Sequence, residues 1–150
     1  IADQLGQQAL DTVKPERLLV PTAKRLVAPA PAPPDPTQHT VDHYVCYKVK
    51  PTPKAAKLPK GLRVAATDQF TSPAKTFAVK KPLRLCVPAD KNDEGVENPA
   101  VHLLCYQVKP AKGQPKYVKR TGVLATSQFG ALAFDAVAEA ELCLPSLKIP

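Results

Sequence analysis

The chain has 150 residues, a formal net charge of +8 at neutral pH, 18 prolines and no tryptophan or methionine. The prolines and the short apolar runs rich in valine and leucine exclude a helical bundle and favour β-strands. No apolar run approaches the roughly 20 residues that a membrane-spanning helix needs. Without a methionine, Ile1 is not a translation start, and we expect a processed product or part of a longer protein.

The lysines are scattered along the chain, for example in 50–60 and 78–84, and no aromatic stacking motif of RNA-binding sheets interleaves with them. A net positive charge alone supports only non-specific binding to nucleic acid. We therefore interpret the lysines as solvated side chains at strand edges, and we expect no nucleic-acid partner.

The first predicted element, 1–24, repeats the end of the chain. Residues 3–24 align with 127–148 without a gap, and eight of the 22 positions are identical. This stretch corresponds to the second half of a repeat whose first half is missing, so its partner strands are expected in another molecule or in upstream residues. We therefore expect a β arm packed away from its own body, with its apolar contacts supplied by Leu10, Val13, Leu18, Leu19 and Val20.

A proline-rich linker, 25–40, follows the arm. Its alternating Ala-Pro stretch cannot donate regular ladder hydrogen bonds and favours extended polyproline II. Thr37 and Thr40 are candidate O-glycan sites, although ordinary linker threonines are the commoner interpretation. The sequence therefore predicts a semi-rigid spacer between the arm and the body.

Two repeats make up the remainder, 41–98 and 99–150. "VDHYVCYKVKP" (41–51) matches "AVHLLCYQVKP" (100–110), "ATDQF" (66–70) matches "ATSQF" (125–129), and "LCVPADK" (85–91) matches "LCLPSLK" (142–148). The period is about 57 to 59 residues. We predict an all-β fold of tandem small β-sandwich or barrel-like repeats, each with four to five short strands.

Alternation in the first repeat assigns side chains to faces. Val45, Tyr47 and Val49 are expected on one face of a strand, opposite Tyr44, Cys46 and Lys48. Prolines lack the N–H that a central ladder needs, so Pro82 and Pro88 are expected at strand ends or edges. Phe70 and Phe129 are expected to anchor the core.

The four cysteines, Cys46, Cys86, Cys105 and Cys143, indicate disulfides in an oxidising compartment. No pair has the close spacing typical of zinc sites. Leu19 stands where Cys86 and Cys143 stand in the other copies, and the first half that it would bridge to is missing. This favours Cys46–Cys86 and Cys105–Cys143 among the three pairings, in a secreted or cell-surface protein.

No residues form an obvious catalytic constellation. His43 and His102 occupy equivalent places, but only the first has an acidic neighbour, Asp42, so we interpret both as structural imidazoles. No serine lies in a nucleophile-elbow motif, and no glycine-rich phosphate loop is present. We therefore expect neither an enzyme nor a bound cofactor.

The loop 89–100 is the only acidic cluster. Asp90, Asn92 and Glu94 imitate the opening of a calcium-binding EF-hand loop, but Val101 stands where such a loop needs a bidentate carboxylate. We interpret this loop as a solvated connector, and weak calcium binding is the alternative.

The segments "DHYVCYKVK", "DQF", "KPLRLCVPADKNDEG", "HLLCYQVKP" and "LCLPS" resemble a family of secreted bacterial repeat domains of unknown function. The resemblance covers 41–148 and also extends to 14–24, which is similar to the family's Cys-less repeat ends. In the family such ends follow first halves with serine in place of cysteine, which supports bridges within a repeat. The resemblance implies no activity.

Two functions remain open from the sequence. The first is a secreted structural subunit that polymerises head to tail by exchanging its N-terminal strands, because an unpartnered strand satisfies its edge by joining another sheet. The alternative is a monomeric surface module that binds polysaccharide or protein. The lack of tryptophan counts against sugar stacking.

Overall fold

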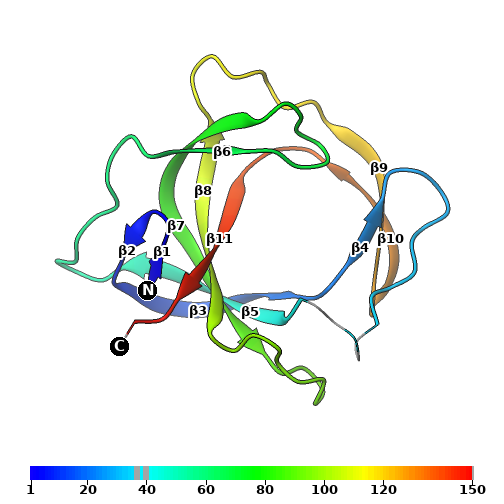
Figure 1. The fold of residues 1–150 in the computed structure, drawn as a ribbon, viewed down its shortest axis with the longest axis horizontal. Coiled ribbons are helices and arrows are strands. Elements are labelled where there is room, and N and C mark those ends of the chain that lie inside the picture. Colours follow the sequence, from blue (N-terminus) through cyan, green and yellow to red (C-terminus); the bar gives the residue numbers. More distant parts are fainter. Residues whose placement is uncertain (36–37, 39–40, 150) are drawn as a thin grey trace.

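The structure, a computed structural model, describes residues 1–35, 38 and 41–149. These residues form strands and loops without a helix, and every strand pair is antiparallel, which confirms the expected all-β fold (Figure 1). The strands are β1 (Ala2–Asp3), β2 (Gly6–Gln7), β3 (Leu10–Leu19), β4 (Ala23–Arg25), β5 (His43–Pro51), β6 (Arg63–Ala66), β7 (Lys75–Ala89), β8 (Val101–Pro110), β9 (Arg120–Ser127), β10 (Gly130–Ala136) and β11 (Glu141–Leu147).

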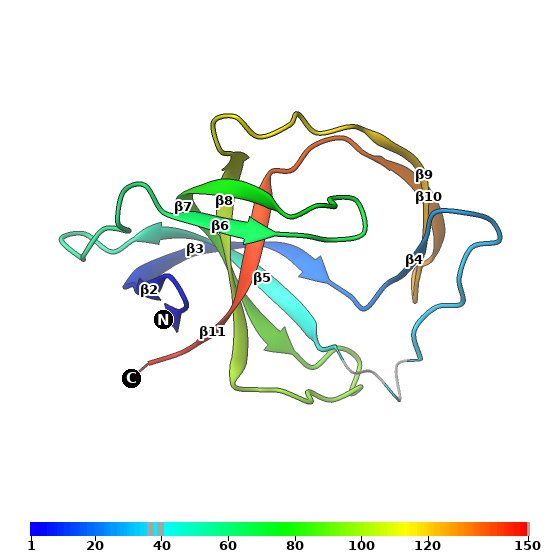
Figure 2. The same ribbon diagram turned by 45° about the horizontal axis from the view of Figure 1, so that its top comes forward.

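The strands form one large and one small sheet. The large sheet has the order β2-β1-β11-β8-β7-β5-β3, with β6 paired to β7, and the small sheet has the order β10-β9-β4. Figures 1 and 2 show the small sheet standing to the right of the large one. The chain therefore crosses to the small sheet after β3 and returns after β4, and it crosses again after β8 and returns before β11.

The arm and both expected repeats share the large sheet. Its five long strands follow one another in chain order, β3, β5, β7, β8 and β11, and they alternate between second halves and first halves of the repeat pattern. We expected separate small bodies, and the structure differs. One continuous sheet gives every long strand except β3 two neighbours, and it buries more apolar surface than two very small bodies could.

Sequence-equivalent residues pair in the same register. The arm strand β3 pairs with β5 in the way that β7 pairs with β8, and the matching pairs are Leu10↔Pro51 and Phe77↔Pro110, Pro15↔Tyr47 and Pro82↔Tyr106, and Arg17↔Cys46 and Arg84↔Cys105. In both pairs, β3 with β5 and β7 with β8, a second-half strand therefore pairs in the same register with the first-half strand that follows it in the chain.

The arm lies against its own chain, which corrects the expectation that it would pack elsewhere. β3 pairs along its length with β5, and β4 pairs with β9 in the small sheet. The expectation failed because it assumed that the arm needs a preceding first half. The register above shows that the following first half, β5, also offers an edge.

The main core lies on one face of the large sheet. Its buried residues are Val49, Phe77, Val79, Leu85, Leu104, Tyr106, Val108 and Leu144. A second cluster on strands β5, β7 and β8 contains Tyr44, Cys46, Cys86 and Cys105. Val49 and Cys46 of β5 thus belong to different clusters, in agreement with the alternation in the sequence.

Three expectations about single residues or strands were wrong. Phe129 is 71% exposed, and Phe70 is only partly buried beneath the ammonium group of Lys24, 4.7 Å from its ring centre. Pro82 lies inside β7, where the register shifts on both of its sides, whereas Pro88 is the penultimate residue of the strand, near its end as expected. Such irregularities accommodate a residue that cannot donate to the ladder. Because β7 runs through both prolines, the range 41–98 contains three strands instead of four or five.

Candidate assembly surfaces

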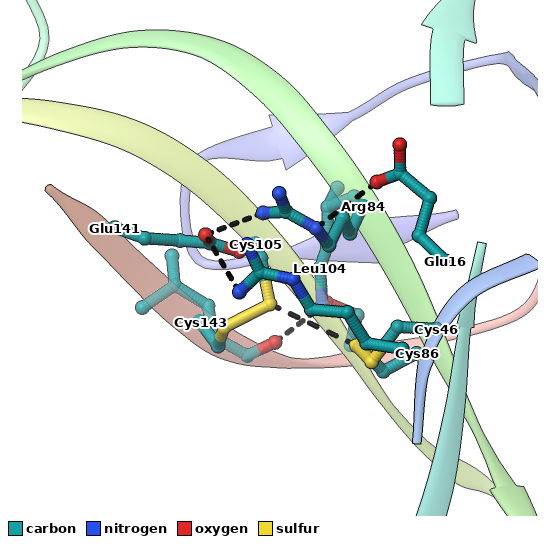
Figure 3. Close-up of a disulfide and its surroundings, with 11 residues drawn as sticks. Glu16, Cys46, Arg84, Cys86, Leu104, Cys105, Glu141 and Cys143 are labelled. Carbon is teal, nitrogen blue, oxygen red and sulfur yellow. Dashed lines mark hydrogen bonds and ion pairs between the residues drawn. A yellow bond between two sulfur atoms is a disulfide. The ribbon is translucent and has the colours of Figure 1, made fainter. Parts of the chain in front are cut away.

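Two disulfides join adjacent strands of the large sheet. Cys46 of β5 bonds Cys86 of β7, and Cys105 of β8 bonds Cys143 of β11. This is the pairing that the sequence favours. The sulfur atoms of Cys86 and Cys105 lie 4.0 Å apart, so the two bridges form a row across four strands (Figure 3). Each bridge ties a first-half strand to the second-half strand that follows it.

Ion pairs centred on Arg84 connect strands that are not neighbours. The Nε of Arg84, on β7, lies 3.3 Å from Oε2 of Glu16 on β3, and its Nη1 donates to Glu141 on β11 (Figure 3). Arg17 lies 3.9 Å from the same Glu141 carboxylate but is half exposed. The Arg84 side chain is mostly buried, so removing one of its acidic partners would cost more than breaking an exposed pair. These ion pairs hold β3, the long strand of the arm, toward β11.

The beginning of the arm is fixed by a polar network. Tyr106, fully buried on β8, donates its hydroxyl to Asp3 and accepts a hydrogen bond from the side-chain amide of Gln8. The terminal ammonium of Ile1 donates to the carbonyl of Gln8 over 2.8 Å. Burial, followed by the hydrogen bond to Asp3 and its negative charge, raises the pKa of Tyr106 well above its ordinary value. The phenol therefore stays neutral at physiological pH.

The five arm residues singled out from the sequence have different surroundings. Leu10, Leu19 and Val20 are partly buried, and Leu10 packs against the main core. Val13 and Leu18 are about half exposed. Val13 and Leu18 are exposed in this arrangement, in which β3 is the outermost strand of its sheet and has one neighbouring strand among the described residues.

A second apolar surface lies on the β9–β10 hairpin and was missed by sequence reasoning. Phe129, Leu132, Phe134 and Val137 are all exposed, and six of the seven residues of β10 are exposed. β10 is the edge strand of the small sheet. The signal was available in the sequence, since the stretch 129–137 combines apolar residues with a single charge.

The acidic loop is anchored to the start of β5. Both carboxylate oxygens of Asp42 accept backbone N–H groups, from Glu97 over 2.7 Å and from Asn98 over 2.9 Å. The carboxylate of Glu94 lies 3.3 Å from Nε2 of the buried His43 and also contacts Lys91. His43 therefore contributes to the packing of this loop.

The remaining chemical candidates occupy ordinary structural positions. Asp90 accepts the backbone N–H of Gly95 over 3.0 Å, and Asn92 adopts a left-handed φ of 57° in the turn. Nδ1 of His102 lies 3.1 Å from the carbonyl of Ala100. The candidate calcium residues Asp90, Asn92 and Glu94 thus lie in a tight connector, in which Asp90 and Glu94 already have protein partners.

Among the described residues, the single group of side chains close enough to hold a metal ion is Cys105, Glu141 and Cys143, and its two cysteines are bonded to each other. No helix in this described part of the chain is long and apolar enough to cross a membrane. Thr37 and Thr40, the candidate glycan sites, lie outside the described residues.

A comparison with protein-family models, curated proteins and solved structures finds no match for this chain. We therefore infer a function from the geometry of the chain itself.

Proposed function

We propose that the chain is a non-enzymatic extracellular structural protein, a subunit of a head-to-tail filament assembled by exchange of N-terminal β-strands. The observation that carries this proposal is the docking of the arm. Its strands β3 and β4 add to two sheets of the body through strand pairing. Strand addition is a mode by which one chain completes the sheet of another.

The arm can make the same contacts in trans. It is joined to the body by 28–40, where eight of the 13 residues are alanine or proline. A stiff, extended spacer favours transfer of the arm to a neighbour, because bending it back costs more than leaving it straight. Exchange in which each arm reaches the next subunit does not close on itself, so it yields a filament.

The exposed apolar residues of the arm also support assembly. Val13 and Leu18 project from an edge strand whose outer side has no neighbouring strand among the described residues. Unpaired edges of this kind are templates for pairing with another chain. The two disulfides are consistent with an extracellular location. The resemblance to secreted repeat domains remains part of this proposal.

An engineered bridge tests arm exchange directly. Leu18 and Val45 are directly paired residues of β3 and β5, and neither is fully buried. In the double variant Leu18→Cys/Val45→Cys, exchange places the two new thiols in different subunits. We expect a ladder of covalent oligomers on a non-reducing gel after assembly. Leu18→Cys alone is the control, because a single new thiol can link at most pairs. A double variant that yields only monomer would contradict exchange.

Deletion of 1–27 separates the arm's role from that of the body. We expect the truncated protein to keep both disulfides and to lose filaments in negative-stain micrographs. Filaments identical to those of the intact chain would contradict the proposal.

The alternative, a monomeric surface module that binds polysaccharide or protein, is favoured by one observation. A cavity of about 500 Å³ lies beside the arm and β11, and its lining includes Phe70, Tyr117, Asp68 and Glu139. Aromatic and acidic groups together are typical of small binding sites. Light scattering separates the two functions, because a binding module stays monomeric at concentrations where a filament subunit assembles.

A further inference from the structure

The β9–β10 hairpin is equivalent to the β6–β7 hairpin. "RVAATDQF" (63–70) aligns with "GVLATSQF" (122–129), and Phe77 aligns with Phe134. In the first hairpin Val64 pairs with Phe77, and in the second the equivalent Val123 pairs with Phe134. In both hairpins, therefore, the first strand pairs with the same edge of the second strand, and the opposite edge of the second strand is the one that a further strand can join.

That edge is covered in the two other copies. Beyond β7 lies β8, with Pro110, Lys109 and Val108 opposite Phe77, Ala78 and Val79. The arm shows the same pairing, in which β5 places Pro51, Lys50 and Val49 opposite Leu10, Asp11 and Thr12. In both cases the covering strand is a first half that ends in Val-Lys-Pro.

In the third copy the edge is open. The equivalent residues are Phe134, Asp135 and Ala136, and β10 has β9 as its sole neighbour among the described strands. The burial follows this difference, since Phe77 is 8% exposed and Phe134 is 46% exposed. β10 also lacks the prolines and lysines that usually protect an edge strand.

We propose that the outer edge of β10, continued by β11, binds an antiparallel strand of another molecule that carries the pattern H-x-x-C-Y-x-V-K-P of residues 43–51. The register follows from the two existing copies, with the proline opposite Phe134 and the preceding lysine opposite Asp135. This surface is distinct from the edge that receives the arm, so the inference does not depend on arm exchange.

Charge supports this choice of partner. In the arm, Asp11 lies opposite Lys50, and the equivalent of Asp11 in the third copy is Asp135. Opposite charges at directly facing positions stabilise a strand pair, and like charges destabilise it. Asp135 also forms an exposed ion pair with Lys119 over 2.8 Å, which contributes little to stability.

The neighbouring stretch of β11 is also open. β1 pairs with β11 only through Ala2 and Leu147, at the far end of that strand. By the alignment, Glu141, Leu142 and Cys143 of β11 correspond to Arg17, Leu18 and Leu19, which face Cys46, Val45 and Tyr44 of β5. An incoming strand thus finds unpaired backbone along both β10 and the first part of β11.

The test uses a fluorescently labelled peptide of residues 41–51 with Cys46→Ser, added to the full chain at concentrations where it is monomeric. We expect saturable binding by fluorescence polarisation. Asp135→Lys should weaken binding at least about tenfold, and a peptide with Lys50→Glu should restore it to the charge-reversed variant. Lys119→Ala is the matched control and should bind like the parent, because it removes the ion pair and keeps the carboxylate.

Hydrogen exchange locates the bound peptide. We expect slower exchange in 134–136 and 141–146, and unchanged exchange in the arm, 10–19. Absence of binding, protection of the arm strand instead, or equal binding by a scrambled peptide would each overturn the inference. Failure of arm exchange leaves these results unaffected, because the peptide experiment needs neither filaments nor movement of the arm.

Discussion

The hairpins β6–β7 and β9–β10 have the same register and similar sequences, yet the second strand of the first hairpin is largely buried and that of the second is exposed. Val64↔Phe77 and Val123↔Phe134 are equivalent pairs, but among the described residues only the second strand of the first hairpin, β7, has a further strand, β8, on its other side. The aromatic residue at this position is therefore core or surface according to its neighbour. Local sequence forms the hairpin, and the next strand in the sheet determines whether its apolar side chains are buried.

The largest expected effect comes from truncating the two equivalent aromatic residues. Phe77→Ala removes a buried ring from the main core and should lower the free energy of unfolding by about 3–5 kcal/mol. Phe134→Ala removes an exposed ring and should cost under about 1 kcal/mol. Urea unfolding of both variants measures the difference. Equal losses would show that β10 is buried in solution.

The next effect concerns the bridges that fix β7 and β11. Each closes a loop of similar length, with separations of 40 and 38 residues. In the chain-entropy model, replacing either cysteine pair by serine should cost about 3–4 kcal/mol. Thermal unfolding of Cys46→Ser/Cys86→Ser and Cys105→Ser/Cys143→Ser should therefore give similar shifts. A much smaller loss for the second pair would indicate that β11, with its exposed Cys143, is less firmly held than β7.

A pH experiment examines β8, the strand that distinguishes the two hairpins. The folded pKa of Tyr106 is raised above its unfolded value, so its contribution to stability is complete below about pH 10 and is lost as the pH rises through the folded pKa. Tyr106→Phe should flatten the fall in unfolding free energy above pH 10. At neutral pH it should cost about 1 kcal/mol through its lost hydrogen bonds to Asp3 and Gln8. An unchanged alkaline slope would contradict the assignment.

The smallest effect is expected at Leu132, which aligns with Lys75 of the other hairpin. Lys75 is buried and pairs with Glu139 over 2.5 Å, whereas Leu132 is exposed. Leu132→Lys should therefore change the unfolding free energy by less than about 0.5 kcal/mol. Differential scanning calorimetry measures this. A marked destabilisation would mean that the leucine is covered by other residues in solution.

The sequence predicted the features that depend on local pattern. Recurring Cys46, Cys86, Cys105 and Cys143 indicated the disulfide pairing, because one cysteine in each half leaves few consistent connections. Alternation along 44–49 placed Val49 and Cys46 on opposite faces, since strand geometry fixes side-chain direction.

Strand adjacency was not predictable in the same way. Periodicity says which face of a strand is apolar, but not which strand lies beside it. For this reason the pairing of the arm with β5, and the sharing of one sheet by both repeats, were missed. Phe129 was misjudged because its aromatic side chain is typical of a core position, whereas it lies exposed in the turn between β9 and β10. Pro82 was misjudged because an irregularity in the ladder accommodates it.

The positions of the bridges also determine how the chain would respond to tension. Each disulfide closes a loop of 40 or 38 residues, so about half of the chain cannot lengthen when its ends are pulled apart. No disulfide joins β7 to β8 or β3 to β5, so these strand pairs would separate first. If such subunits form a filament, the filament would therefore lengthen under tension in short steps. When the tension falls, each released segment would refold against a loop that its disulfide had kept closed.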